Sequence, residues 1–140
     1  MKIFISSDHA GFNLKNYIYN ILKNKNYKII NLGPFDDKSV DYPVYAKKLA
    51  NKVAKNRSSF GILICGSGTG MAMSANKVKN IRAAVCYNEK NTKLSRLHNN
   101  ANIITVGSRL TNKNLALKLI NIFLKTKFEG GRHLRRIKKI

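Results

Sequence analysis

Short apolar runs alternate along this chain with longer segments whose apolar residues have helical spacing. The runs cover residues 2–6, 27–31, 62–64, 82–86 and 103–106. Short continuous apolar runs next to glycine or polar residues are typical of strands buried on both faces of a parallel sheet. The pattern therefore predicts five buried strands.

The segments between these runs predict amphipathic helices. Three of them carry apolar residues at intervals of three or four positions: Leu14, Ile18, Ile21 and Leu22; Ala46, Leu49, Ala50 and Val53; and Ala116, Leu119, Ile120, Phe123 and Leu124. These intervals bring the apolar residues to one helical face. Pro43 suits the start of the second helix, and residues 71–76 and 92–97 predict two shorter helices.

Strand and helix alternate five times, which predicts an α/β protein with a single domain over residues 1–140. Strands joined through helices form parallel sheets with right-handed crossovers and helices on both faces. We therefore expect a three-layer αβα sandwich around a five-stranded, Rossmann-like parallel sheet, followed by a C-terminal tail helix.

Ligands of such sheets bind in the crevice beyond the carboxyl ends of the strands. We expect Asp8, Cys65, His98 and Arg109 to lie just after such ends. His98 is either an ordinary surface histidine or a group that moves protons near neutral pH, and its neighbours Asn99 and Asn100 favour a polar site. These side chains are the first candidates for an active site.

The segment Cys65–Gly70 joins a predicted strand to a predicted helix through a glycine turn. Such a turn leaves the first amides of the helix unpaired, which suits an anion or a developing oxyanion. A dinucleotide site would need Gly-x-Gly-x-x-Gly, whereas this turn reads Gly-x-Gly-x-Gly; Glu89 lies at a suitable distance for that alternative, which stays open. The Gly-Lys-Ser/Thr of a nucleotide P-loop does not occur.

The two cysteines have different contexts. Cys65 either packs in the core as a structural residue or acts as a base or nucleophile. Its position before a helix amino terminus favours the chemical role. Cys86 lacks such a turn and is expected to be structural. Two cysteines at the ends of buried strands do not suggest a disulfide framework, so a reduced compartment fits.

The net charge of +21 raises the possibility of a nucleic-acid-binding module. The lysines are scattered over every predicted helix, however, and form no basic stripe interleaved with aromatic residues. An anionic substrate would gain from the same charge. Near the C-terminus, Arg132 and Arg136 would share one helical face and could clamp a phosphate, or belong to a solvated basic tail.

The sequence contains no apolar stretch of membrane-spanning length and opens in strand-like sequence instead of a signal peptide. We therefore expect a soluble, cytoplasmic protein that does not associate with a membrane.

Six motifs, in order and from end to end, closely resemble the ribose-5-phosphate isomerase type B family. They are Ser7-Asp8-His9-Ala10-Gly11, Asp41-Tyr42-Pro43, Cys65-Gly66-Ser67-Gly68-Thr69-Gly70 with Ala75-Asn76-Lys77, His98-Asn99-Asn100-Ala101-Asn102, Gly107-Ser108-Arg109 and Gly130-Gly131-Arg132-His133. The resemblance implies a cofactor-free and metal-free aldose–ketose isomerase that interconverts ribose 5-phosphate and ribulose 5-phosphate through a cis-enediolate.

The resemblance also implies roles for individual residues. His98 would help to open the furanose ring, Asp8 would bind and orient sugar hydroxyls, and Cys65 would carry the proton between C2 and C1. Ser67, which is usually threonine in relatives, would help proton exchange between the enediolate oxygens. Those oxygens would be held by the backbone amides of the turn, namely Gly66, Ser67, Gly68, Thr69 and Gly70.

By the same resemblance, His9, Arg109, Arg132 and Arg136 would hold the phosphate, and Tyr42 would form a wall of the sugar pocket. Family members are homodimers, some of which pair into tetramers. Their sites would take the His98-Asn99 and Arg109 positions from the opposite subunit.

Neighbouring families leave the substrate open. Heteromeric galactose-6-phosphate isomerases divide these motifs between two chains, whereas this chain has both Cys65 and His98. Some relatives use a glutamate later in the turn as the base, but residues 70–75 contain no acid. Allose-6-phosphate isomerases share the whole constellation, so a six-carbon substrate remains the main alternative, with specific nucleic-acid binding a less favoured one.

Overall fold

The computed structural model describes residues 1–25 and 27–140. Its strands are β1 (Lys2–Ser7), β2 (Lys28–Asn31), β3 (Ser59–Cys65), β4 (Ala83–Val85) and β5 (Ile103–Gly107). Its helices are α1 (Phe12–Asn24), α2 (Tyr42–Ala54), α3 (Thr69–Ala75), α4 (Glu89–Leu97), α5 (Lys113–Lys125) and α6 (Gly131–Ile137).

The strands form one five-stranded sheet in the order β2-β1-β3-β5-β4 within the described part of the chain, and every pair is parallel. The predicted Rossmann-like sheet is therefore confirmed. The central strand β3 pairs with β1 and β5, and the register sets Cys65 beside Gly107 and Ile64 beside Ser7. The carboxyl ends of these three strands thus meet at one edge.

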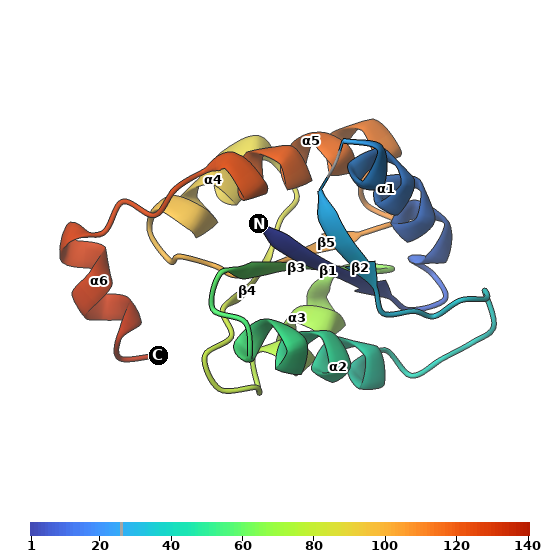
Figure 1. The fold of residues 1–140 in the computed structure, drawn as a ribbon, viewed down its shortest axis with the longest axis horizontal. Coiled ribbons are helices and arrows are strands. Elements are labelled where there is room, and N and C mark those ends of the chain that lie inside the picture. Colours follow the sequence, from blue (N-terminus) through green and yellow to red (C-terminus); the bar gives the residue numbers. More distant parts are fainter. Residues whose placement is uncertain (26) are drawn as a thin grey trace.

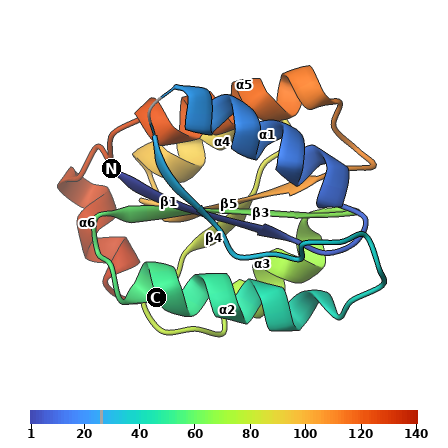
Figure 2. The ribbon, with the colours of Figure 1, turned by 45° about the vertical axis from the view of Figure 1, so that its right-hand side comes forward.

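Helices cover both faces of the sheet, as the three-layer prediction requires (Figures 1 and 2). Helices α1, α4 and α5 lie on one face, and α2 and α3 lie on the other. Successive residues of β3 alternate between the two cores: Ile62 and Ile64 pack on the α1 and α5 side, and Leu63 and Cys65 on the α2 and α3 side. This two-sided burial explains why the strand reads as a continuous apolar run.

The two shorter helices begin two or three residues earlier than the sequence predicts. α4 begins at Glu89, three residues earlier than predicted, because the Asn88 side chain accepts a hydrogen bond from the Asn91 amide at 2.8 Å and caps the helix. α3 begins at Thr69, directly after Gly68, whose φ of 80° ends the preceding turn. In both cases a local backbone or capping feature, and not apolar periodicity, decides where the helix starts.

The C-terminal tail is helical, as predicted. α6 lies beyond the end of the sheet at which the strands begin, away from the main body of α5 (Figures 1 and 2). No helix in the described residues is both long enough and apolar enough to cross a membrane.

Candidate active site

The turn after β3 holds the Cys65 thiol close to the backbone. Cys65 is 5% exposed, and its Sγ atom accepts a hydrogen bond from the Gly68 amide at 3.1 Å. Gly68 has a φ of 80°, and a Cβ there would lie 3.1 Å from the carbonyl carbon of Val106. Only glycine fits this position without strain, so the turn requires glycine where the amide meets the thiol.

The hydroxyl-bearing residues of the turn are exposed. The amide of Thr69 is 3.3 Å from the Ser67 hydroxyl oxygen, which accepts its hydrogen bond. Gly107 approaches the turn from β5, and a Cβ on Gly107 would lie 2.8 Å from the backbone of Ser67. The turn is therefore seated directly on the end of β5, with the Ser67 and Thr69 side chains toward solvent.

Asp8 lies at the neighbouring strand end, beside this turn. Its amide donates to the Ile64 carbonyl at 3.1 Å, and its carboxylate accepts a hydrogen bond from the Gly11 amide at 2.9 Å. The Asp8 side chain is buried. A buried carboxylate with a single local donor retains further acceptor capacity for hydroxyl groups.

The residues that follow β5 lie at the same edge of the sheet as Cys65 and Asp8. The amides of Ser108 and Arg109 donate to the carbonyls of Cys65 and Gly66 at 2.8 and 3.0 Å. The Arg109 guanidinium lies over Gly66, where a Cβ would be 3.1 Å from its Nη1 atom. The resemblance implied that Arg109 reaches a site from the opposite subunit; in this structure its guanidinium lies against Gly66 of its own chain.

His9 and Tyr42 flank the same edge. The Val40 amide donates to Nδ1 of His9 at 3.3 Å, so a neutral His9 ring carries its proton on Nε2 and can donate to an anion. Tyr42 begins α2, with Pro43 in the first turn as predicted. Its ring packs on Gly70, where a Cβ would lie 2.8 Å from the ring carbons.

His98 does not join this edge, contrary to the sequence prediction. It is the C-terminal cap of α4, and the following Asn102 carbonyl accepts a hydrogen bond from Gly61, near the start of β3. A crossover helix returns the chain to the edge where the next parallel strand begins, so its end cannot lie at the carboxyl edge. At roughly 3.3 Å per strand residue, Gly61 and Cys65 lie about 13 Å apart.

A second cluster forms at this amino edge. The His98 ring stacks on the His133 ring with a centroid distance of 4.2 Å and an interplanar angle of 9°. Arg132 and Arg136 are exposed one helical turn apart on α6, and Asn99 is exposed next to His98. The predicted site residues therefore divide into two groups at opposite edges of the sheet.

The second cluster also contains the only group of possible metal ligands in the described part of the chain. The ligand atoms of His98, Glu129 and His133 all lie within 4.8 Å of one another. The two imidazole rings are almost parallel, whereas a shared ion would have to lie in both ring planes. The observed side-chain arrangement does not converge on a metal.

Cys86 differs from Cys65, as predicted. It is part of the core between the sheet and α5, and Ser95 Oγ lies 3.9 Å from its sulfur atom. Burial raises the pKa of the Cys86 thiol, while hydrogen bonds from Thr92 and Ser95 oppose this shift. Cys86 is thus a protonated structural thiol.

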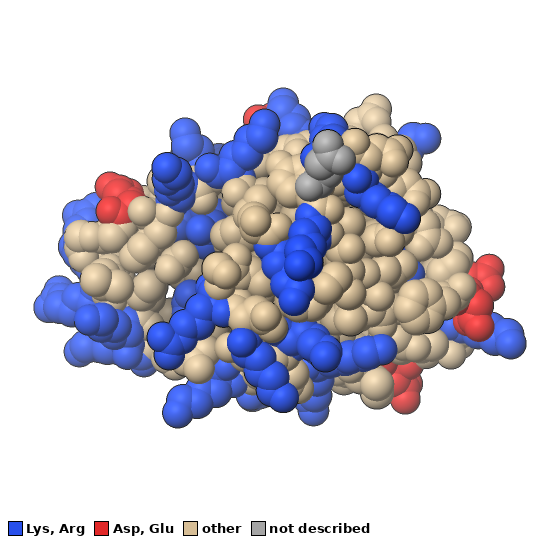
Figure 3. All heavy atoms as spheres, in the orientation of Figure 1, with Lys and Arg blue, Asp and Glu red and all other residues tan. Residues whose placement is uncertain are grey.

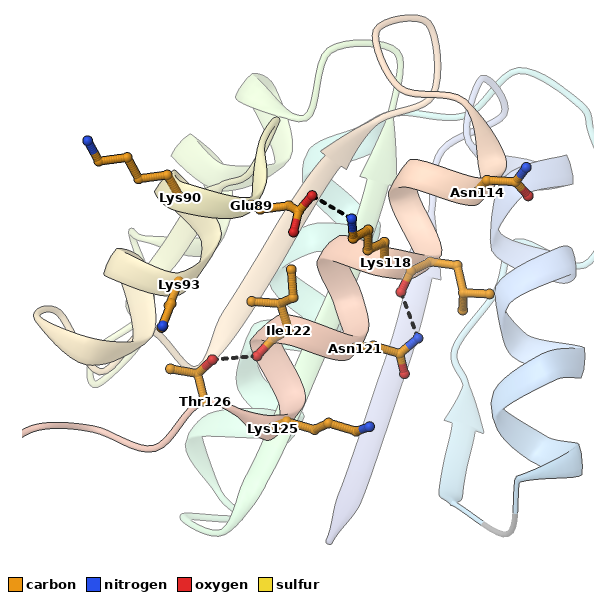
Figure 4. A pocket seen from close by; sticks show the side chains of 10 residues that line it. Glu89, Lys90, Lys93, Asn114, Lys118, Asn121, Ile122, Lys125 and Thr126 are labelled. Atoms are coloured by element: carbon orange, nitrogen blue, oxygen red, sulfur yellow. Dashed lines mark hydrogen bonds and ion pairs between the residues drawn. The ribbon is translucent and has the colours of Figure 1, made fainter.

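A shallow groove of about 970 Å³ lies between α4 and α5, away from both clusters (Figure 4). The ion pair between Glu89 and Lys118 crosses it at 2.6 Å. Glu89 is therefore engaged with a lysine on α5, which gives no support to the dinucleotide alternative for the glycine turn.

Basic side chains are distributed over the visible face of the molecule and do not form one stripe (Figure 3). Acidic side chains are few there, in keeping with 27 basic and 6 acidic residues in the sequence. The surface therefore attracts anions generally, without the stripe that a dedicated nucleic-acid site requires.

Sequence reasoning assigned no role to several residues that build the two clusters. Gly11 donates to Asp8, Val40 orients His9, and Ser108 donates from its hydroxyl to the Ala10 carbonyl at 2.9 Å. The Asp8 side chain accepts from the Gly11 amide three residues later, a local pattern of aspartate and glycine that the sequence alone could have indicated. The contacts of Val40, Ser108 and His133 join segments far apart in sequence, so no local sequence pattern predicts them.

Taken together, a parallel α/β sheet with a thiol, a carboxylate, an arginine and the backbone amides of a glycine turn at one strand edge defines a protein built to bind a small anionic ligand. A family model described as Ribose/Galactose Isomerase matches residues 3–140, and the chain belongs to this family.

Individual relatives agree with this assignment. The ribose-5-phosphate isomerase B of Escherichia coli is 40% identical over 139 residues, which are 99% of this chain and 93% of the relative. The structure of Clostridium thermocellum ribose-5-phosphate isomerase B has a TM-score of 0.97 at 46% identity, covering 99% of this chain and 94% of that one. The Mycoplasma genitalium enzyme, solved with bound ribulose-5-phosphate, has a TM-score of 0.96 at 46% identity, covering 99% and 92%.

Proposed function

We propose that this protein interconverts D-ribose 5-phosphate and D-ribulose 5-phosphate as a single-domain aldose–ketose isomerase. The observation that carries the proposal is the Cys65 thiol, held 3.1 Å from the Gly68 amide at the end of β3 in a member of the ribose/galactose isomerase family. The similar Mycoplasma genitalium enzyme holds ribulose-5-phosphate. The proposed setting is the cytoplasm, in the non-oxidative branch of the pentose phosphate pathway.

Cys65 is the proposed proton carrier. As a thiolate it removes the proton from C2 of the open-chain aldose, and the electrons of the broken C–H bond form the C1–C2 double bond. The C1 carbonyl oxygen becomes the enediolate oxyanion. A proton then passes from O2 to O1, and the thiol returns its proton to C1, which leaves the carbonyl at C2.

The glycine turn supplies the proposed stabilisation of the enediolate. The amides of the turn would hold the developing oxyanion, and the exposed Ser67 hydroxyl would pass the proton between O2 and O1. Asp8, with acceptor capacity left on its carboxylate, would orient the sugar hydroxyls. Tyr42 would form one wall of the sugar pocket. The amides that carry this role are Gly66, Ser67, Gly68, Thr69 and Gly70.

The proposed complete site needs two copies of the chain. Ring opening by His98 with Asn99, and phosphate binding by Arg132 and Arg136, would come from the amino-edge cluster of a second subunit. His9 and Arg109 would contact the phosphate from the same chain as Cys65. The separation of the two clusters supports a homodimer, since side chains at opposite edges of one sheet cannot contact one small sugar phosphate.

The chemistry is tested by comparing Cys65→Ala with Cys86→Ala, a matched loss of a second buried thiol. Each protein is assayed without added metal on ribose 5-phosphate and on allose 6-phosphate. We expect the first variant to lose turnover and the second to retain it. Normal isomerisation by Cys65→Ala would disprove its role, and a preference for the six-carbon sugar would keep the mechanism and change the substrate.

The shared site is tested by mixing two inactive variants, Cys65→Ala and His98→Asn. In a random mixture, half of the dimers are hybrids and each hybrid contains one intact site, so about one quarter of wild-type activity should return. Mixing after covalent cross-linking of each homodimer is the control. If no activity returns in the free mixture, the two clusters do not act across an interface.

A further inference from the structure

Helix α6 is joined to the rest of the molecule through very little buried surface. His133 is the single buried residue of this helix, which is described along its whole length. Immediately before the helix, the Glu129 amide donates to the Leu97 carbonyl at 3.1 Å. The position of α6, with its exposed Arg132 and Arg136, therefore depends on what His133 contacts.

The contact of His133 is the imidazole of His98. The side chain of His133 is 10% exposed and that of His98 is 37% exposed, so the buried ring lies behind the exposed one. Oε2 of Glu129 lies 3.7 Å from Nε2 of His98 and 4.0 Å from Nε2 of His133. One carboxylate thus faces both rings of the stack.

We propose that His133 is a positioning residue that docks α6 on the end of α4 and holds His98, Arg132 and Arg136 as one unit, with the Glu129 carboxylate facing both rings. The functional part of this proposal rests on the proposed isomerase activity, because it assigns these groups to ring opening and phosphate binding. A ligand would thereby meet the imidazole and both guanidinium groups in a fixed arrangement, which avoids an ordering cost on binding.

Several charged groups face the stack. Burial lowers the pKa of His133, His98 lowers it further, Arg132 and Arg136 add to this effect, and Glu129 opposes it. Arg82, just before β4, and Arg96 on α4 donate to carbonyls of the loop that follows His98. At neutral pH the His133 ring is therefore uncharged, and protonation in acid would introduce a positive charge beside these groups.

Two substitutions separate stacking from titration. His133→Ala removes the ring, and His133→Phe keeps a flat ring that cannot be protonated. We expect KM for ribose 5-phosphate to rise about tenfold in His133→Ala, since the clamp loosens, and to stay within about twofold in His133→Phe. Arg135→Gln, an exposed change on the same helix, is the control and should leave KM unchanged.

The pH profile provides a readout that simple loss of packing would not change. As the pH falls below neutral, KM should rise more steeply in the wild type than in His133→Phe, because only the wild type can acquire a charge at position 133, whereas both proteins retain His98. Identical profiles for these two proteins, or a His133→Phe enzyme as weak as His133→Ala, would overturn the proposal.

Hydrogen exchange of the α6 amides tests the docking without reference to activity. Exchange over residues 131–137 should be much faster in His133→Ala than in the wild type, and close to wild type in His133→Phe. Unchanged protection in His133→Ala would disprove docking through this ring. If the wild type fails to isomerise ribose 5-phosphate while exchange follows the expected order, the proposed function fails and the docking stands.

Discussion

The amide of Gly68 donates a hydrogen bond at 3.1 Å to Sγ of Cys65, three residues earlier in the chain. The left-handed backbone of Gly68, with φ of 80°, brings the amide to the thiol. The hydrogen bond thereby fixes the sulfur atom relative to the other backbone amides of the same turn. In the proposed reaction, this relation keeps the proton carrier and the oxyanion donors in register.

Replacing Gly68 with alanine should damage both stability and turnover. A left-handed alanine costs about 1–2 kcal/mol, and the new Cβ would also press on Val106 backbone atoms at 3.1 Å. Gly131→Ala is the control, since φ is 51° there and nothing lies within 4 Å of a Cβ. Urea unfolding should show the larger loss for Gly68→Ala; equal losses would mean that the Val106 contact contributes nothing.

Alanine at Gly70 should impair substrate binding, whereas alanine at Gly107 should impair stability. A Cβ at either position would come within 2.8 Å of its neighbour, but Gly70 faces the exposed Tyr42 ring and Gly107 faces the Ser67 backbone. A side chain can rotate away, whereas a packed backbone cannot. We expect Gly70→Ala to raise KM several-fold with little change in Tm, and Gly107→Ala to lower Tm strongly. Equal Tm values for Gly70→Ala and Gly107→Ala would contradict this interpretation.

Arg96 should be required for the loop that carries His98. Its guanidinium donates to the Ala101 carbonyl at 2.5 Å, to the Asn100 side chain at 2.9 Å and to the Thr126 carbonyl at 3.2 Å. Lysine keeps the charge but cannot serve three acceptors, so Arg96→Lys should lower the free energy of unfolding by about 2–3 kcal/mol. The exposed Arg57→Lys is the control. A loss no larger than that of the control would contradict the assignment.

Lys15 should give the protein a measurable pH dependence of stability. Its ammonium group is buried against the Phe12 ring and donates to the Pro34 carbonyl, and burial lowers its pKa from 10.5 to about 8. Between these values the unfolded chain binds more protons than the folded one, so the free energy of unfolding rises with pH, by up to about 3 kcal/mol. Urea midpoints from pH 7.5 to 10.5 measure this rise.

Lys15→Met is the matched variant for this pH series, because it retains an unbranched side chain without the ionisable group. The other lysines titrate equally in both proteins, so the difference between the two curves isolates Lys15. We expect the wild type to gain stability relative to Lys15→Met as the pH rises from 8 to 10.5. Parallel curves would show that the buried amine titrates normally.

Nucleic acid should bind weakly and without relation to the proposed site. The charge of +21 predicts association with DNA at low salt that falls steeply as salt increases. Fluorescence anisotropy with a random duplex, from 50 to 200 mM salt, should show the same slope for the wild type, Cys65→Ala and His98→Asn. High affinity near physiological salt would favour the nucleic-acid module instead.

Much of the fold was predictable because its signals are local. Five apolar runs and the helical spacing between them are sufficient for a parallel α/β sheet, since burial on both faces leaves a continuous apolar strand. The glycine turn was also predictable, because Gly66, Gly68 and Gly70 directly follow the apolar run of β3. Lys15 shows the limit of this reasoning: it is one of the lysines spread along the predicted helices, yet it is buried.

The sequence by itself thus determined the class of fold, the Cys65 turn and the residues that resemble an isomerase site. Only the tertiary structure decided that these residues form two clusters, with Cys65 and Arg109 at one edge of the sheet and His98 at the other. The reason is geometric. Each crossover helix carries the chain back to the edge where the next strand starts, so position relative to a strand end depends on three-dimensional connection and not on residue type.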